Sequence, residues 1–207
     1  MEYGLNDADV VELAALVSVV DRQLSPAVDW FLWGEDDVFV GYTRKWCSAH
    51  LSRLASMYLP NKWRQRKIHL ATHSQLVHCL RQLTDNEIGC ELYGLAKRCL
   101  TALSYILGKK TYFVGDRPTA IDAYVFSRLW PLLHYESQQG NVSWLTIGPT
   151  GASPSLCQSA SHPLIAHVIQ CPNLVAHFIR IQSEFFPKAA AHFRGGKSGS
   201  ASFIFLS

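Results

Sequence analysis

The chain has 207 residues, of which 48% are hydrophobic and only 17% charged, and a formal net charge of +3. This length suits one domain with a sizeable core, and the low charged fraction indicates a subunit whose faces are covered by neighbours. No apolar run reaches the roughly 18 residues of a membrane span, and six cysteines without a Cys-x-x-Cys pair favour free thiols over a disulfide scaffold.

Charge is distributed unevenly along the chain. Residues 1–43 carry nine acids against Arg22 alone, whereas residues 44–110 carry twelve bases against three acids. We predict that these two regions pack antiparallel, so that their opposite charges partly neutralise each other.

The N-terminal part predicts two long helices that form an antiparallel pair. Asn6 or Asp7 caps the first, and Gly34 ends it. We expect Ser25-Pro26 to kink or interrupt this helix, because proline lacks the N–H that the ladder needs. Its apolar stripe is formed by Val10, Leu13, Ala14, Val17, Val20 and Leu24. The second helix begins with Glu35-Asp36-Asp37, where negative charge suits a helix start, and runs to Pro60.

A basic helix is predicted next, capped by Asn61 and running from Lys62 to about Leu83. Its first turns hold a basic cluster around Trp63: Lys62, Arg64, Arg66 and Lys67. Such a cluster can bind RNA or anionic lipid headgroups, but we favour an ordinary solvated helix face.

Histidines on this helix raise the question of a metal. His69 and His73 have the i, i+4 spacing of shared ligands, and His78 and Cys79 lie beyond them. No carboxylate stands between the two histidines, as it does in the His-Glu-x-x-His pattern, so we expect no metal site.

Two further helices are predicted from capping boxes. Thr84 to Glu87 opens a helix that Gly108 closes. Thr119 and Asp122 form the second box, behind which Ala123, Phe126, Leu129, Trp130 and Leu133 recur at helical spacing. So apolar a helix belongs inside a bundle, where its free N–H groups need partners from within the chain. We therefore predict that Thr119 and Asp122 form a buried structural N-cap, with no catalytic role and no cofactor.

The rest of the chain predicts a long loop, two short helices and a tail. Residues 137–160 are rich in Gly, Pro and Ser and form a loop that is mobile or held by a partner. Helices resume near Ser161 and from Pro172 to about Phe185. Residues 188–207 form a disordered or partner-bound tail.

Two phrases carry a resemblance to a known family. The pattern Gly115-Asp116-x-x-Thr119-x-x-Asp122-Ala123 before an apolar helix resembles the C-terminal, all-helical domain of the glutathione S-transferase fold. The longer phrase from Tyr112 to Phe126 is most similar to the metaxins and the related failed-axon-connections proteins. A second phrase, Cys171 to Pro187, is similar to the closing helix of metaxins. Only Ser127-Arg128 departs locally, where metaxins usually have a Gly-His pair.

The resemblance implies an all-α fold. Residues 1–187 would form a glutathione S-transferase C-terminal-like bundle of seven or eight helices, without the thioredoxin-like domain in which transferases bind glutathione. It also implies a non-catalytic subunit of a mitochondrial membrane assembly, since metaxins belong to the outer-membrane machinery that sorts and inserts β-barrel proteins. The expected partners are a β-barrel assembly protein or another metaxin-like protein, with peripheral contact to the outer membrane and no nucleic acid.

Three alternatives remain open at this point. The chain is an accessory subunit of another mitochondrial complex, such as a respiratory complex of the inner membrane. Or it is the helical half of a transferase-like enzyme, which predicts retention on immobilised glutathione. An RNA- or lipid-binding module rests on the basic cluster alone.

Overall fold

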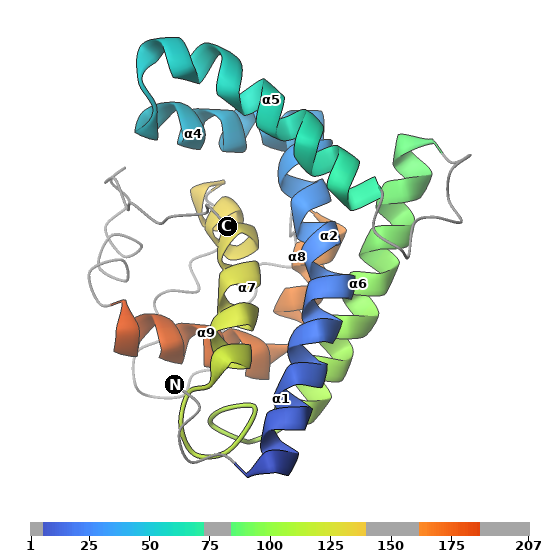
Figure 1. The fold of residues 1–207 in the computed structure, drawn as a ribbon, viewed down its shortest axis with the longest axis vertical. Helices are drawn as coiled ribbons and strands as arrows, with labels where there is room; N and C mark the ends of the chain where they lie inside the picture. Colours follow the sequence, from blue (N-terminus) through green and yellow to red (C-terminus); the bar gives the residue numbers. More distant parts are fainter. Residues whose placement is uncertain (1–5, 73–83, 140–161, 187–207) are drawn as a thin grey trace.

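The computed structural model describes residues 6–72, 84–139 and 162–186 (Figure 1). Helical segments that follow one another without a break are counted here as one continuous helix, or rod. Counted in this way, the described residues form seven helices and no strand, so the predicted all-α bundle is confirmed. The first rod comprises α1 (Asp7–Val19), η1 (Val20–Leu24), α2 (Ser25–Asp29) and η2 (Trp30–Gly34), and the second comprises α3 (Asp36–Val38), η3 (Phe39–Thr43) and α4 (Arg44–His50). The remaining rods are α5 (Arg53–Thr72), α6 (Asp85–Leu107), α7 (Ala120–Gln138), α8 (Pro163–Ile169) and α9 (Pro172–Phe185).

Several predicted features lie outside the described residues. They are most of the 137–160 loop, the 188–207 tail, and the histidine and cysteine positions His73, His78 and Cys79.

The first rod passes through Ser25-Pro26 without interruption and ends at Gly34 as predicted. Because Pro26 has no N–H, the turn before it is a wide π-helical turn, in which the N–H of Ser25 donates to the carbonyl of Val20 five residues back. The widened turn keeps the helix continuous past the proline. The predicted apolar stripe is partly wrong: Val10 and Ala14 are exposed, whereas the buried side is formed by Leu13, Leu16, Val20 and Leu24.

The predicted boundary at Pro60 is wrong. The second rod ends at His50, Leu51 is extended (φ −111°, ψ 156°), and α5 runs from Arg53 through Pro60 to Thr72, so Asn61 is not a cap. Proline costs an interior helix one hydrogen bond. That cost is offset by packing, because Pro60 is buried and α5 lies along α2 and η2.

The predicted neutralisation of the acidic and basic regions is confirmed where α5 packs on the first two rods. Arg64 forms an ion pair with Asp36, and Lys67 donates to Asp29 at 3.4 Å. Both acids come from the acidic N-terminal region and both bases from the basic one.

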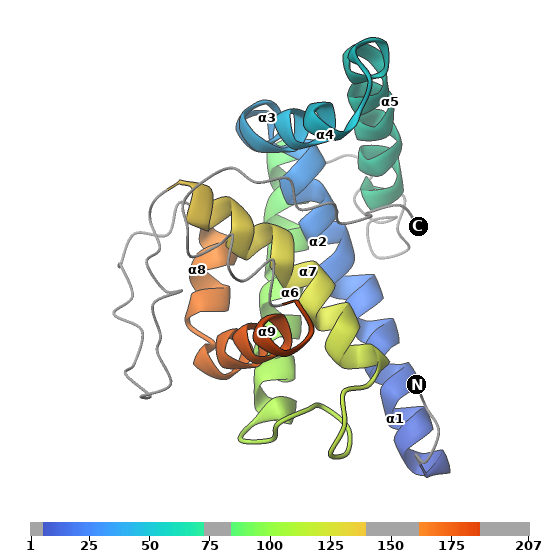
Figure 2. The ribbon, with the colours of Figure 1, turned by 90° about the vertical axis from the view of Figure 1, so that its left-hand side faces the viewer.

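The core lies where the first rod, α6, α7, α8 and α9 meet. The first rod and α6 run side by side along the long axis, α7 packs beside them, and α9 crosses α6 and α7 (Figures 1 and 2). Stacked rings of Phe126, Phe178 and Phe186 join α7 to α9. The α4–α5 hairpin forms one end of the molecule (Figure 2). Within the described ranges no single helix is long and apolar enough to cross a bilayer; α8 and α9 meet that requirement only as a pair, bent by 83°.

Candidate functional site

The start of α7 is held by one buried carboxylate. Thr119 is the N-cap residue of α7, and both halves of its capping box with Asp122 are present. The backbone N–H and the hydroxyl of Thr119 each donate to Oδ2 of Asp122 at 2.8 Å. Only 6% of Thr119 and 1% of Asp122 is exposed. The cap therefore lies inside the protein, out of contact with water.

The other carboxylate oxygen ties α7 to two further segments. Oδ1 of Asp122 accepts from the backbone N–H of Phe113 at 3.2 Å and from Nε2 of His177, on α9, at 2.8 Å. Phe113 belongs to the connection between α6 and α7, and its ring packs edge-on against the His177 ring. Asp122 thus joins the start of α7 to the α6–α7 connection, nine residues back, and to α9, 55 residues further on.

Hydrogen bonding decides the charge of Asp122. Burial acts to raise the pKa of Asp122, because desolvation disfavours a carboxylate. The hydrogen bonds from His177, Thr119 and Phe113 outweigh burial and hold that pKa below its ordinary value. The ionised carboxylate accepts from four donors, which uses its acceptor capacity. Each of its two oxygens is therefore held by two donors from within the fold.

Sequence reasoning missed the part that His177 plays in this network. Its Nε2 carries the proton that Asp122 accepts, and its Nδ1 is buried without a hydrogen-bond partner among the described residues. One signal was present in the sequence. His177 stands among apolar residues on the buried side of α9 (Leu174, Phe178 and Ile181). A polar side chain on an apolar helix face requires a buried partner, and Asp122 is that partner.

A second polar cluster fastens the junction of the first two rods to α6 and α8. The Tyr93 hydroxyl donates to Oε1 of Glu35, and Nε2 of His162 lies 2.9 Å from the same oxygen. Nδ1 of His162 accepts from the N–H of Leu164, so Nε2 is the nitrogen that donates. Burial acts to raise the pKa of Glu35, but the bonds from His162 and Tyr93 lower it further than burial raises it. This cluster too was not predicted, because Glu35 was assigned only to the start of a helix.

The basic cluster is divided between the fold and the surface. Arg64 points inward: its Nε donates to the carbonyl of Trp33 at 2.8 Å, its Nη2 donates to that of Gly34 at 3.2 Å, and its guanidinium lies 4.6 Å from the centre of the Phe39 ring. These carbonyls end the first rod, where positive charge is favourable. Lys67 is also paired, whereas Lys62 and Arg66 are exposed. The predicted solvated helix face is therefore correct for Lys62 and Arg66, whereas Arg64 and Lys67 take part in the packing of α5.

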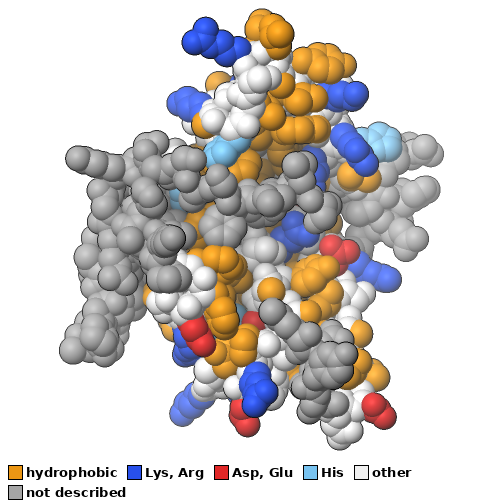
Figure 3. All heavy atoms as spheres, turned by 60° about the vertical axis from the view of Figure 1, so that its left-hand side comes forward, with side chains coloured by type: hydrophobic (Ala, Val, Ile, Leu, Met, Phe, Trp, Pro, Cys, Tyr) orange, Lys and Arg blue, Asp and Glu red, His pale blue; other side chains and the backbone are white. Residues whose placement is uncertain are grey.

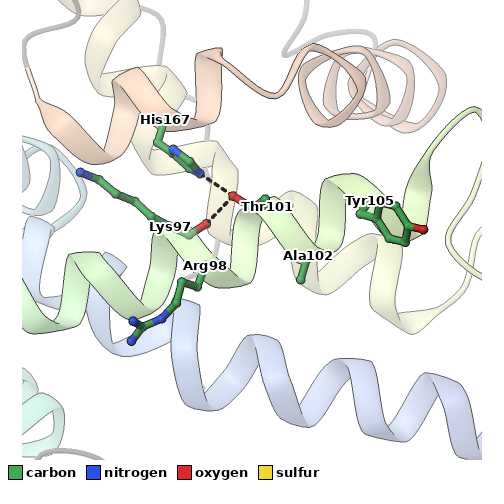
Figure 4. A pocket seen from close by; sticks show the side chains of 6 residues that line it. All are labelled: Lys97, Arg98, Thr101, Ala102, Tyr105 and His167. Carbon is green, nitrogen blue, oxygen red and sulfur yellow. Dashed lines mark hydrogen bonds between the residues drawn. The ribbon is translucent and has the colours of Figure 1, made fainter.

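A shallow hollow lies between α6 and α8 (Figure 4). Its lining residues are Lys97, Arg98, Thr101, Ala102, Tyr105 and His167. Nε2 of His167 lies 2.9 Å from the hydroxyl of Thr101, which also donates to the carbonyl of Lys97 at 3.0 Å. Lys97, Arg98 and Tyr105 spread along α6 instead of converging on one point (Figure 4). In the part of the chain that the structure describes, no group of three or more His, Cys, Asp or Glu residues could hold a metal ion.

Comparisons with known protein families match two parts of the chain. A family model described as "Glutathione S-transferase, C-terminal domain" matches residues 96–146, and one described as "Outer mitochondrial membrane transport complex protein" matches residues 1–64. No solved structure matches the chain significantly.

Curated relatives match most of the chain. Metaxin-1 of Mus musculus is 27% identical over 189 residues, which is 90% of this chain and 51% of the relative. Metaxin-1 of Bos taurus is 29% identical over 186 residues, with the same coverage of 90% and 51%. Metaxin-3 of Xenopus laevis is 28% identical over 172 residues, or 81% of this chain and 52% of the relative. The chain thus spans about half the length of these relatives.

Proposed function

Because the chain is homologous to metaxin-1 and metaxin-3 over most of its length, we propose that it is a non-catalytic subunit of a protein transport assembly in the outer mitochondrial membrane. The finer proposal is that this assembly sorts and inserts β-barrel proteins. Its partners are a β-barrel assembly protein or another metaxin-like protein. The chain lies peripherally on the membrane.

One observation carries the proposal. Residues 1–64 match a model whose description names an outer mitochondrial membrane transport complex, and the metaxin relatives extend that match along 90% of the chain. Of these residues the structure describes 6–64, which form the first two rods and the first part of α5, with Arg64 of α5 paired to Asp36 of the second rod. Within this matched part, α5 packs on α2, η2 and α4.

The polar networks support a subunit that works by contact. The Asp122 carboxylate is filled by its four donors, and the Glu35 cluster holds helices together. The side chains around the hollow on α6 do not converge as the polar groups of a catalytic pocket do. The carboxylates of Asp122 and Glu35 are thus accounted for by contacts within the bundle.

Purification of the tagged chain from mitochondria of its native source tests the proposal. After mild detergent extraction, we expect the chain to migrate in a complex that contains a β-barrel membrane protein and a second metaxin-like protein. Depletion of the chain should lower the amount of newly assembled β-barrel proteins in the outer membrane. The level of inner-membrane complexes serves as the control.

The same experiment separates the alternatives. Recovery with a respiratory complex would assign the chain to the inner membrane and refute the outer-membrane proposal. The family match of residues 96–146 gives the transferase alternative a specific test. Retention on immobilised glutathione, together with glutathione-dependent turnover, would replace the non-catalytic proposal by an enzyme.

A further inference from the structure

The α4–α5 hairpin ends in exposed apolar side chains. Leu54 is 85% exposed, Met57 73% and Tyr58 64%, and all three lie in the first turns of α5. We call these three residues the apolar tip. In Figure 3 hydrophobic side chains cover the end of the molecule that this hairpin forms, with basic side chains around them. Leaving such large side chains in water is unfavourable unless something covers them.

Exposed bases lie on the same hairpin as the apolar tip. We call them the basic collar: Arg44, Lys45, Arg53, Lys62 and Arg66. Arg44 and Lys45 begin α4, and Arg53 begins α5. Lys62 and Arg66 follow Tyr58 by one and two helical turns. No ion pair joins a collar residue to an acid within the described ranges, and no Asp or Glu occurs between Val38 and Thr84. The hairpin therefore combines exposed positive charge that no acid pairs with and an apolar end.

We propose that the α4–α5 hairpin binds the surface of a membrane that contains anionic lipids. The basic collar contacts the headgroup phosphates, and the apolar tip enters the boundary between headgroups and acyl chains. The inference rests on the proposed function for the membrane that the chain meets, and it adds the face of the chain that touches it.

The composition of the tip distinguishes a lipid surface from RNA. Single-stranded nucleic acid is held by basic grooves with aromatic side chains on which the bases stack. On this hairpin Tyr58 is the exposed aromatic residue, since Trp46 and Trp63 are half-buried. Leu54 and Met57 are aliphatic and gain free energy by leaving water for an apolar phase. A bilayer offers that phase next to negative charge.

Flotation of the full chain with vesicles tests the proposal. We expect binding to phosphatidylcholine vesicles that contain about one fifth phosphatidylserine, and none to phosphatidylcholine alone. Binding should weaken as salt rises from about 50 to 500 mM, because the Debye length shortens several-fold over that range. Equal binding to both kinds of vesicle, or to neither, overturns the proposal.

Charge-reversal variants locate the surface. The variant Arg53→Glu/Lys62→Glu/Arg66→Glu should bind anionic vesicles on the order of a hundredfold more weakly, at about fivefold for each base removed. Its matched control, Arg98→Glu/Lys109→Glu/Lys110→Glu, changes the net charge equally at other exposed bases and should bind as the native chain does. Equal loss in both variants overturns the proposal, since net charge alone would then explain binding.

A charge-preserving variant tests the tip. Leu54→Ser/Met57→Ser should weaken binding to anionic vesicles about tenfold or more, because less apolar surface leaves the water. Unchanged binding overturns the proposal. These side chains are exposed, so the circular dichroism spectrum and the urea midpoint should stay those of the native chain.

Four further results separate this inference from its alternatives and from the proposed function. Binding of an RNA oligomer without binding of vesicles overturns it in favour of nucleic acid. Loss of partner proteins by the collar variant with unchanged vesicle binding overturns it in favour of a protein interface. Vesicle binding by a chain that purifies with a respiratory complex supports the inference while refuting the proposed function. If the chain does not bind vesicles but still purifies with an outer-membrane complex, the inference is overturned and the proposed function stands.

Discussion

Replacing Asp122 by alanine removes the acceptor on which the start of α7 depends. Two backbone N–H groups, of Thr119 and Phe113, and the ring N–H of His177 lose their partner in a region closed to water. Each unsatisfied buried donor costs about 1–3 kcal/mol, and the Thr119 hydroxyl can rotate towards another acceptor. We therefore expect Asp122→Ala to lower the free energy of unfolding by at least about 3 kcal/mol, a large part of the roughly 5–15 kcal/mol typical of a domain.

Urea unfolding followed by far-ultraviolet circular dichroism measures this loss. With a denaturant slope of about 1–3 kcal/mol/M, the midpoint should fall by about 1 M or more. Asp122→Asn keeps one acceptor oxygen and should lie between the native chain and Asp122→Ala. The capping box at the start of α6 provides a matched control, because Thr84 and Glu87 form the same motif on the exposed surface.

Burial separates the two capping boxes, so the comparison tests the reasoning directly. Glu87→Ala leaves donors that water can reach, and its midpoint should shift far less than that of Asp122→Ala. Equal shifts in the two variants, or a change in Asp122→Ala of only a few tenths of a kcal/mol, would refute the claim that the α7 cap is a buried anchor.

Three further predictions concern pH, space and charge. The folded pKa of Asp122 lies below its unfolded value of about 3.9. The ionised carboxylate therefore stabilises the fold fully above that pH, and this stabilisation is lost as pH falls through the folded pKa. The difference in unfolding free energy between the native chain and Asp122→Asn should be constant at neutral pH and shrink below about pH 4. Gly34→Ala should cost about 1–3 kcal/mol in urea unfolding, because the new Cβ would lie 2.8 Å from the Trp30 ring, whereas Gly94→Ala meets open space and should be neutral or stabilising by up to about 1 kcal/mol. Arg64→Ala should destabilise by about 1–3 kcal/mol, and Arg64→Lys should recover only part of that loss in thermal melts, because an ammonium lacks the fork that reaches two carbonyls at once.

Local chemistry was predictable from the sequence. The helix starts at Asn6 and Thr84 and the end at Gly108 were placed correctly, because caps depend on residues within one turn of each other. Gly108 has a positive φ of 49°, a conformation that favours glycine. The pairing of acidic and basic regions was also predictable, since it follows from charge alone.

The helix break at Leu51 and the hydrogen-bond partner of His177 depend on tertiary packing, which local sequence patterns do not show. Pro60 carries the strongest helix-breaking signal in its region, yet the chain breaks at Leu51 and buries the proline inside α5. The acceptor for His177 lies 55 residues away on another helix, so only a folded chain reveals that the two side chains meet. A pattern within one helix can show that a partner is needed but not which residue it is.

The wide turns of the first two rods bear on how this chain can change in length. A π-helical turn holds one residue more than the α-helical path that it replaces, and three such turns occur at Val20–Leu24, Trp30–Gly34 and Phe39–Thr43. Elsewhere in a helix, loss of one residue rotates everything beyond it by about 100° and scrambles the buried side. Loss of one residue from a wide turn instead restores the regular ladder and leaves both flanking faces in phase. The wide turn at Phe39–Thr43 lies between α3 and α4, so an orthologue one residue shorter there is compatible with the same core.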